Sequence, residues 1–363
     1  MTRRVVFVIA DLGSGGAQQV VVRMTNRLAE LNWDCFVLTL DDGKQDFVLP
    51  QQNVTLVRLG MTSQNKTWFR AFCENFKRVL ALRRALTDIS PSSVVSFIGP
   101  TNCLMILASV GKNFKLVVSE RNDPSRQSFG WFWDTCRKAL YRFADVVSAN
   151  SKEAVAWLEQ YVPERKLRYL PNPIKQIDHD IKIKPLPERE KKIISVGRLH
   201  PQKNYSFLIN AIGKIHRDIP GWQLCIVGVG EQETALRAQV KELGLDNVVS
   251  FLGRVGRPYE VLGRAPIFLM PSLYEGQPNA LLEAMAAGCA PIVSSAIPDI
   301  EYIMENGRCG IICDPSDQKA WEKAILELVG DVEKRQGFAD RSLSRSREWE
   351  LSAVEKIWCD TLM

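Results

Sequence analysis

The chain has 363 residues, of which 46% are hydrophobic and 24% charged, and this composition is typical of a globular protein with about two domains. Its nine cysteines form no CxxC pair and it has three histidines, which excludes a disulfide framework and a histidine-rich metal site. No run of about 18 apolar residues is present, and the apolar stretch near the N-terminus is too short for a signal peptide. We therefore expect a cytoplasmic protein without a membrane-spanning helix.

The net charge of +6 is distributed unevenly along the chain. Residues 1–185 contain 26 lysines and arginines against 17 acidic residues, whereas residues 186–363 contain 21 against 24. The basic half indicates an anionic partner, such as a membrane surface, a phosphorylated acceptor or nucleic acid, or else ordinary surface scatter.

The first half of the chain alternates short apolar runs with helical patterns. Arg4–Ala10 is rich in β-branched residues and predicts a strand, which leads through a glycine-rich loop into a helix from Gln18 to Leu31. Strand–helix alternation of this kind indicates a parallel sheet covered by helices. Further strands are expected at Phe36–Leu40, Val54–Leu59, Val94–Phe97, Leu116–Ser119 and Val146–Asn150.

A proline-rich polar segment, Asn172–Arg189, is interpreted as a linker, after which the alternation begins again. The expected strands are Lys192–Val196, Trp222–Val227, Val248–Phe251, Ile267–Met270, Ala290–Ser294 and Gly310–Cys313, and the expected helices are Tyr205–Asp218, Glu231–Leu243, Pro315–Val329 and Ser344–Leu362. We predict an α/β protein with two Rossmann-like domains, 1–171 and 172–345, and a C-terminal helix in 346–363 that crosses back to the first domain.

Three glycine-containing loops follow predicted strands. Gly13–Ala17 can bring backbone N–H groups close to an anion, and the alternative is a tight strand–helix turn. In the second loop, Arg198 and Lys203 flank a helix N-terminus and can clamp a diphosphate, unless they form a solvated basic loop. The third, Gly228–Glu231, can approach a base or ribose, or can simply start a helix.

The fourth motif, Pro271–Gly288, is the most informative. Glu275 lies just before a predicted helix and Glu283 lies inside it, among apolar residues that predict a buried helix. Carboxylates accept paired hydrogen bonds from vicinal hydroxyls, and a buried carboxylate without a partner is costly. The pair therefore predicts a site for a sugar or a ribose, and the alternative is a core helix with a solvent-facing glutamate.

The segment PSLYEGQPNALLEAMAAGCAPI resembles the EX7E signature of the retaining glycosyltransferase family 4, whose fold is GT-B. The stretches GSGGAQ, PNPI, GRLHPQKN, GVGEQ and FLGRV follow in the order of that family, so the resemblance covers nearly the whole chain. It implies two doubly wound domains facing a cleft, and transfer of a sugar from a nucleotide diphosphate donor with retention at the anomeric carbon.

The resemblance also implies roles for individual residues. Arg198, Lys203 and Glu275 would carry the reaction, the first two by neutralising the diphosphate and the third by holding sugar hydroxyls. Glu283 would hold the ribose. The implied donor-binding set is completed by Gly15, Gly16, Ala17, Gly197, Val229, Gly230, Arg254, Gly276, Gln277, Pro278, Asn279, Ala280 and Leu281.

One departure from the family concerns the N-terminal domain, where many relatives carry a histidine near the sugar. The matching stretch here contains Glu120, Arg121 and Asn122, which we predict on the acceptor side. The proposed family mechanism needs no protein base, because the departing phosphate takes the acceptor proton. The chain lacks a DxD-type cluster, so we expect no metal and no other cofactor, with Arg198 and Lys203 supplying the positive charge.

Two aromatic and basic segments suggest that the acceptor is reached at a membrane surface. Lys66–Arg84 predicts a basic amphipathic helix that can lie on an anionic membrane, and Ser125–Tyr141 is a second such patch; the alternative for both is a helix packed on the sheet. Because many bacterial relatives extend lipid-linked glycans, we expect a lipid-linked acceptor, no nucleic acid, and a position on the inner face of the cytoplasmic membrane.

The sequence thus predicts transfer of a hexose or N-acetylhexosamine, from a UDP-linked donor, in bacterial surface polysaccharide or glycoconjugate assembly. The alternatives are a sugar-nucleotide epimerase of the same fold and a non-catalytic binding subunit. The second would be expected to lose Arg198, Lys203 or Glu275, and all three are present. A dinucleotide oxidoreductase is disfavoured because neither half carries GxGxxG with a downstream acid.

Overall fold

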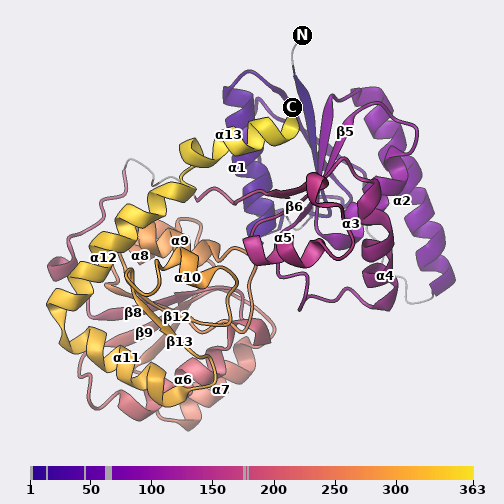
Figure 1. Ribbon diagram of the computed structural model, residues 1–363. Coiled ribbons are helices and arrows are strands. Elements are labelled where there is room, and N and C mark those ends of the chain that lie inside the picture. Colours follow the sequence, from indigo (N-terminus) through magenta and orange to yellow (C-terminus); the bar gives the residue numbers. More distant parts are fainter. Residues whose placement is uncertain (1–2, 14, 45, 62–67, 175–176, 178–179) are drawn as a thin grey trace. The chain divides into compact units, whose positions relative to one another are not determined.

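The computed structural model describes residues 3–13, 15–44, 46–61, 68–174, 177 and 180–363. The chain forms two compact units (Figure 1). Unit 1 comprises the residues up to Pro173 together with Leu351–Met363, and unit 2 comprises Ile174–Glu350. The chain therefore leaves unit 1 once and returns to it with its last helix.

In its described residues, unit 1 is built on a seven-stranded parallel sheet with the order β3-β2-β1-β4-β5-β6-β7. The strands are β1 Arg4–Ile9, β2 Asp34–Thr39, β3 Thr55–Arg58, β4 Ser93–Phe97, β5 Lys115–Glu120, β6 Val146–Ala149 and β7 Leu167–Tyr169. The helices are α1 Gly16–Glu30, α2 Trp68–Ile89, α3 Gly99–Ser109, α4 Trp131–Leu140, α5 Lys152–Leu158 and α13 Leu351–Leu362, with short 3-10 turns η1 Tyr141–Phe143 and η2 Glu164–Lys166.

Both faces of this sheet are covered, as the apolar run Val5–Ile9 of β1 requires. Successive side chains of a strand point to opposite faces. Phe7 and its alternate neighbours accordingly join a core with α1 and α13, while Val6 and Val8 join a second core with α2, α3 and α5. The sheet is thus the middle layer of three, which explains why its strands are hydrophobic runs and do not alternate with polar residues.

Helix α13 is fixed to unit 1 by Trp358, which is fully buried. Its ring stacks against Phe7 and Phe97, with centroids 6.0 and 6.4 Å away. Its Nε1 donates a hydrogen bond of 2.9 Å to the carbonyl of Pro171, close to where the chain leaves unit 1. One side chain therefore joins the first strand, the outgoing segment and the returning helix.

Unit 2 contains, in its described residues, a six-stranded parallel sheet with the order β10-β9-β8-β11-β12-β13. The strands are β8 Lys192–Val196, β9 Gln223–Val227, β10 Val249–Gly253, β11 Ile267–Met270, β12 Ala290–Ser294 and β13 Ile311–Cys313. The helices are α6 Tyr205–Ile215, α7 Glu233–Glu242, α8 Pro258–Leu262, α9 Asn279–Ala286, α10 Ile300–Ile303, α11 Gln318–Gly330 and α12 Val332–Ser346, with 3-10 turns η3 Leu186–Glu188, η4 Pro201–Lys203 and η5 Arg347–Trp349.

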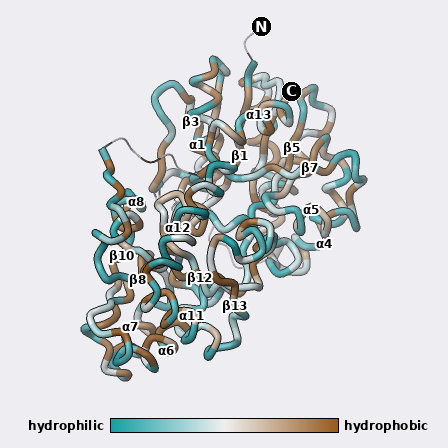
Figure 2. Tube along the Cα trace, turned by 60° about the vertical axis from the view of Figure 1, so that its left-hand side comes forward, coloured by the Kyte–Doolittle hydropathy of each residue, from teal (hydrophilic) through white to brown (hydrophobic). Residues whose placement is uncertain are grey.

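The helices of unit 2 also divide between the two faces. Helices α6, α7 and α11 share one core with Ile193, whereas α8, α9 and α10 share the other with Ile194. Along the trace, helical turns alternate between hydrophilic and hydrophobic colours, as amphipathic helices on a sheet should (Figure 2). The prediction of two Rossmann-like α/β domains is confirmed.

The predicted single helix Ser344–Leu362 is wrong. Helix α12 ends at Ser346, a 3-10 turn covers Arg347–Trp349, and Glu350 is extended before α13 begins. The helix is broken because the chain passes from unit 2 to unit 1 at this point, where the Trp349 carbonyl accepts a hydrogen bond of 2.8 Å from the amide of Ile174. None of the described helices is both long enough and apolar enough to cross a membrane.

Candidate functional site

The sheet of unit 2 has a topological switch point between β8 and β11. The connections that follow these strands lead to helices on opposite faces, α6 and α9, so their loops separate at the carboxyl edge of the sheet. Ligands of open α/β sheets bind at such points. Two motifs singled out in the sequence, Gly197–Asn204 and Pro271–Pro278, form these two loops and are therefore neighbours in the fold.

An ion pair joins the two loops. The ammonium of Lys203 contacts Oε1 of Glu275, and the two side chains are only 17% and 11% exposed. Next to this pair, the amide of Leu273 donates to the Gln202 carbonyl over 2.8 Å, and Gln202 Nε2 donates to the Tyr274 carbonyl over 2.7 Å. A half-buried charge pair held by flanking hydrogen bonds is a preorganised polar site, because its groups need little reorganisation when a charged ligand arrives.

Two further residues occupy the same edge without forming part of that pair. Glu283 lies in α9, is 6% exposed and is surrounded by apolar helix residues, as the sequence predicts. Arg198 lies in the loop after β8 and is exposed. The two loops and α9 therefore add an accessible guanidinium, which precedes Lys203 in the sequence, and a buried carboxylate, which follows Glu275.

The turn before α9 uses some of the amides that the sequence analysis assigned to the ligand. Asn279 N donates to the Gln277 carbonyl over 3.0 Å, and Leu281 N donates to the Pro278 carbonyl over 3.0 Å. The amides of Gly276 and Ala280 meet no acceptor within the described part of the chain. Gly276, in the turn before α9, and Ala280, in its first turn, can therefore donate to a ligand at the positive end of the helix.

Glycines 197, 228 and 230 have packing reasons that the sequence does not reveal. A Cβ on Gly228, whose φ is +142°, would lie 1.9 Å from the carbonyl oxygen of Gly197. A Cβ on Gly230 would lie 2.3 Å from the carbonyl oxygen of Leu199. The loops after β8 and β9 are thus in backbone contact, and Leu199 N also donates to the Val229 carbonyl over 3.0 Å. Gly197 itself leaves room for the stem of Lys203, since its Cβ would be 3.0 Å from Lys203 Cε.

Arg254 is separated from this cluster by the sheet order. It is exposed and follows β10, the edge strand, which is two strands away from β8. It lies at the same carboxyl edge, but the structure does not bring it to the Lys203–Glu275 pair.

Sequence reasoning missed three residues at the switch point of unit 2. Gln202 ties the two loops together. Tyr205 is fully buried, its hydroxyl lies 3.0 Å from the Cβ that Gly197 lacks, and burial raises its pKa. Ser272 is 1% exposed, and its hydroxyl has no hydrogen-bond partner within the described residues. Serine and tyrosine after a strand are too common to single out, so only the fold reveals them.

Unit 1 has its own switch point, between β1 and β4. Gly15 is the N-cap of α1, Gly16 and Ala17 open the helix, and no acidic residue lies in its first turn. The loop is held by Asp11, whose Oδ1 accepts from Gly13 N over 2.9 Å and from Gln18 Nε2 over 3.0 Å. The positive end of a fifteen-residue helix therefore meets no acidic side chain of its own first turn.

The loop across this switch point, after β4, is strained. Ile98 has φ +74° and ψ 133°, a conformation that β-branched residues rarely adopt. Gly99 follows, and a Cβ on it would lie 2.8 Å from the ring of Phe129. No pattern in the sequence predicts this strain, which only the backbone reveals.

The three acceptor-side candidates lie at the end of β5, where Glu120 and Arg121 are already engaged inside unit 1. Glu120 is 1% exposed, accepts a hydrogen bond from the hydroxyl of Tyr141, and has its pKa raised by burial. Arg121 Nη1 donates to the Leu170 carbonyl over 2.9 Å and to Asn172 Oδ1 over 2.8 Å, and the guanidinium lies over the rings of Phe97 and Trp358. Asn122 is half-buried. An acceptor role for these residues stays a prediction.

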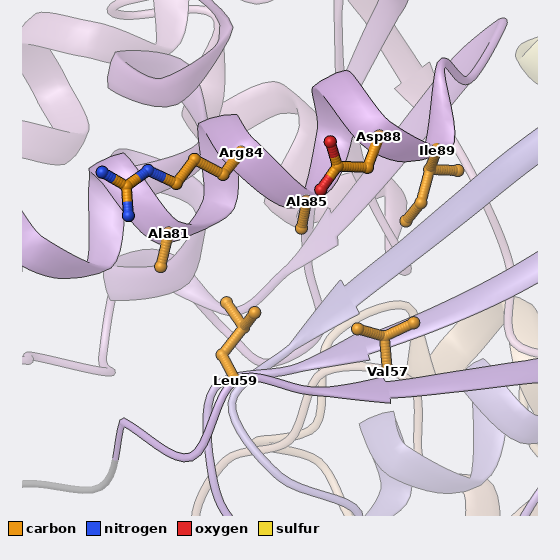
Figure 3. A pocket seen from close by; sticks show the side chains of 7 residues that line it. All are labelled: Val57, Leu59, Ala81, Arg84, Ala85, Asp88 and Ile89. Atoms are coloured by element: carbon orange, nitrogen blue, oxygen red, sulfur yellow. The ribbon is translucent and has the colours of Figure 1, made fainter.

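A hollow of about 440 Å³ lies elsewhere, between β3 and α2 (Figure 3). Apolar side chains from both elements line it, with Arg84 and Asp88 on the α2 side. None of the candidate residues contributes to it. In addition, the described residues contain no group of three or more His, Cys, Asp or Glu side chains that could hold a metal ion.

Comparison with known proteins decides the family. A model of the glycosyl transferase 4-like domain matches residues 15–173, and a model of the glycosyl transferases group 1 matches residues 176–345. The chain belongs to this family of glycosyltransferases.

Two full-length relatives come from Campylobacter jejuni. The chain is 25% identical over 98% of its length, and 97% of the relative's, to the GalNAc-alpha-(1->4)-GalNAc-alpha-(1->3)-diNAcBac-PP-undecaprenol alpha-1,4-N-acetyl-D-galactosaminyltransferase. It is 24% identical, over 94% of both chains, to an N-acetylgalactosamine-N,N'-diacetylbacillosaminyl-diphospho-undecaprenol 4-alpha-N-acetylgalactosaminyltransferase.

Solved structures agree on the fold. A sucrose-phosphate synthase from Thermosynechococcus elongatus superimposes with a TM-score of 0.83 at 19% identity, covering 99% of this chain and 98% of that one. Anabaena HepE in complex with UDP and glucose gives 0.83 at 18% identity, covering 99% of both chains. The predicted GT-B class is therefore confirmed, and the glycosyltransferase carries its charged loop pair in the unit matched by the group 1 model.

Proposed function

We propose that this glycosyltransferase transfers a hexose or N-acetylhexosamine from a UDP-linked donor to a hydroxyl of a lipid-linked glycan, with retention of configuration and without a metal ion. The observation that carries the proposal is the half-buried Lys203–Glu275 pair at the switch point of unit 2. In such a pair the lysine can bind the diphosphate and the neighbouring carboxylate, a few ångströms away, can bind sugar hydroxyls.

The reaction can be written with the groups of this chain. The acceptor hydroxyl oxygen forms a bond to the anomeric carbon as the bond from that carbon to the diphosphate breaks, on the same face of the sugar. The acceptor proton passes to the departing phosphate oxygen, so no protein base is required. Lys203 and Arg198 stabilise the negative charge that accumulates on the diphosphate, while Glu275 and the Gly276 amide orient the sugar. Glu283 would accept hydrogen bonds from the ribose.

The relatives support the choice of donor and acceptor. The two Campylobacter enzymes are named as N-acetylgalactosaminyltransferases acting on undecaprenol-diphosphate-linked glycans, and HepE binds UDP. A lipid-linked acceptor also places the enzyme on the inner face of the cytoplasmic membrane, in surface polysaccharide or glycoconjugate assembly. Helix α2, which overlaps the predicted Lys66–Arg84 segment and continues to Ile89, would face that anionic surface; Lys66 and Thr67 lie outside the described residues.

Thermal unfolding in EDTA with saturating UDP, GDP, ADP or NAD tests the donor site. A ligand at 100 times its dissociation constant stabilises a protein by about 2.7 kcal/mol. We expect a shift with UDP that Lys203→Ala abolishes, whereas Lys214→Ala, a lysine of the same unit with a 62% exposed side chain, keeps it. A shift with NAD alone, or one undiminished in Lys203→Ala, would contradict the proposal.

Product analysis then separates transfer from the alternatives. Incubation with UDP-N-acetylhexosamine and a lipid-linked glycan, in EDTA, should give an α-linked product and UDP from an α-linked donor. An epimerised sugar nucleotide without transfer would identify the epimerase, and UDP binding without turnover would identify a binding subunit.

A further inference from the structure

Exposed aromatic side chains are concentrated on unit 1. Among the described residues, the phenylalanines and tryptophans that are more than 40% exposed are Phe72, Phe76, Trp131, Phe132 and Phe143, and all five belong to α2, α4 or η1. Trp131 is the most exposed of them, at 81%. Single apolar residues on a surface need no explanation, but a group of large aromatic ones marks an interaction surface.

Helix α2 is longer than the sheet it covers. Its 22 residues span about 33 Å, whereas the four and five residues of β3 and β4 span about 13–17 Å. The side chains of α2 are described from Ala71 onward, and the buried ones among them, Leu82, Leu86 and Ile89, lie in its C-terminal half; none from Ala71 to Ala81 is buried. Because α2 leads back to the amino end of β4, its N-terminal half must extend past the carboxyl edge of the sheet.

That half-helix has an unpartnered apolar stripe. Phe72, Phe76 and Leu80 follow one another at intervals of four residues, which places them on one face of the helix, and they are 62%, 59% and 40% exposed. Val79 of the same helix packs against the core of unit 1, so the stripe is one face of an amphipathic helix, the pattern of helices that lie at a membrane interface.

The start of α4 lies at the same edge. The loop 121–130 leaves the carboxyl end of β5, and its Phe129 packs against Gly99, the first residue of α3. Trp131 and Phe132 follow, edge to face with ring centroids 6.1 Å apart. Helix α3 packs against both α2 and α4, so the three helices lie side by side (Figure 1). Phe72, Phe76, Trp131 and Phe132 therefore form an aromatic edge on the side of the sheet where α1 begins.

The exposed charges next to the aromatic edge are basic. Among the described residues there they are Lys77 in the N-terminal half of α2 and Arg126 in the loop before α4, while Asp134, in the first turn of α4, is 23% exposed and pairs with Arg137. Each lysine or arginine near an anionic leaflet contributes about 1 kcal/mol to binding. Aromatic rings and basic side chains together match the headgroup region of an anionic bilayer better than the surface of a protein.

We propose that the aromatic edge inserts into the headgroup region of an anionic lipid bilayer, with the first turn of α4 and the N-terminal half of α2 as its two points of contact. This would hold the carboxyl edge of unit 1 at the depth where a lipid-linked acceptor presents its sugar, and in that respect it rests on the proposed function. The contact surface itself is independent of donor and acceptor.

Vesicle binding tests the proposal with the full chain and no substrate. We expect co-sedimentation with vesicles of phosphatidylcholine and phosphatidylglycerol, and at least about a tenfold weaker partition for Trp131→Ser/Phe132→Ser. Trp131→Phe should keep the binding but lose most of the quenching of tryptophan fluorescence by brominated lipid. The matched control is Phe143→Ser, which removes an aromatic ring of 67% exposure from the opposite end of α4 and should bind normally.

Three results would overturn the proposal. The first is unchanged partition of the double variant, the second an equal loss in Phe143→Ser, and the third a self-association in solution that Trp131→Ser abolishes while vesicles do not bind. Because these measurements omit nucleotide and glycan, a negative result leaves the UDP-dependent thermal shift intact, and the two hypotheses fail separately.

Discussion

The carboxyl edges of the two sheets offer opposite chemistry at equivalent points of the topology. In unit 2 the switch-point loops carry Arg198, Lys203 and Glu275, and they are joined by a half-buried ion pair. In unit 1 the loop after β1 presents Gly15 and Gly16, and its one charged residue, Asp11, accepts hydrogen bonds from Gly13 N and Gln18 Nε2, while the loop after β4 contains the strained Ile98. The same fold thus supplies an ion pair between two loops in one unit, and chiefly backbone amides at a helix N-terminus in the other.

The largest expected effect concerns the charged pair. Lys203→Ala and Glu275→Gln should each lower kcat/KM for transfer by about 10³, equivalent to ~4 kcal/mol of transition-state stabilisation. The control pair is Lys214→Ala and Glu322→Gln, whose charged atoms lie 3.6 Å apart in the same unit with side chains 62% and 18% exposed, and both variants should retain full activity. If the Lys203 variant kept even a tenth of the activity, the contrast between the two edges would lose its basis.

The backbone contact between the β8 and β9 loops predicts the next largest effect. Gly228→Ala should destabilise unit 2 by about 3 kcal/mol or more, because its Cβ would clash with a carbonyl oxygen and could not escape by a change of rotamer. Gly256→Ala is the control, since nothing lies within 4 Å of its added Cβ. Urea unfolding gives both values, and equal stabilities would show that the loops are able to separate.

A smaller effect is expected at the carboxyl edge of unit 1. The strain at Ile98 should make Ile98→Gly more stable than Ile98→Ala by about 1 kcal/mol, because only glycine adopts its φ without cost. Leu107, an exposed residue inside α3, is the control, because there the Leu107→Ala variant should be more stable than Leu107→Gly by about the same amount. Thermal unfolding of the four variants gives the comparison; the same order at both positions would argue against strain at Ile98.

The smallest effect is the pH dependence conferred by Glu120. Burial raises its pKa in the folded state, so its contribution to stability is complete below the unfolded pKa and is lost as the pH rises through the folded one. The melting temperature of Glu120→Gln, relative to that of the unmodified protein, should therefore be higher at pH 8 than at pH 5. Glu159→Gln, at an exposed carboxylate, is the control. A difference that shifts the other way would mean that the Tyr141 hydrogen bond and Arg137 outweigh burial.

The fold was predictable because its signals are local. Buried parallel strands such as β1 and β8 are short runs of β-branched residues, and the glycines after them mark where the chain turns. The break at Trp349 was not predictable, since the apolar spacing continues across it and only the change of unit interrupts the helix. Periodicity indicates which residues are buried, but it does not indicate which unit buries them.

The site was only partly predictable for a related reason. Glu275 and Glu283 stand out because a carboxylate among apolar residues needs a partner, and the predicted burial of Glu283 is what the structure shows. The contact between Lys203 and Glu275 depends on the sheet order, which places β11 beside β8 although 72 residues separate the pair. Gln202 and Ser272 lie inside the two motifs, but the sequence predicts no role for either, because their importance comes only from that juxtaposition.

The packing of Trp358 against Phe7 determines the order in which the two units can finish folding during translation. Phe7 leaves the ribosome before unit 2 is translated, whereas the ring that covers it is translated after unit 2. Unit 2 is an unbroken stretch of chain and can complete its core as soon as it has been synthesised, whereas one face of the sheet of unit 1 is covered only in part, by α1, until α13 has been made. Chaperones that recognise exposed apolar strands would therefore have longer access to unit 1 than to unit 2 during synthesis.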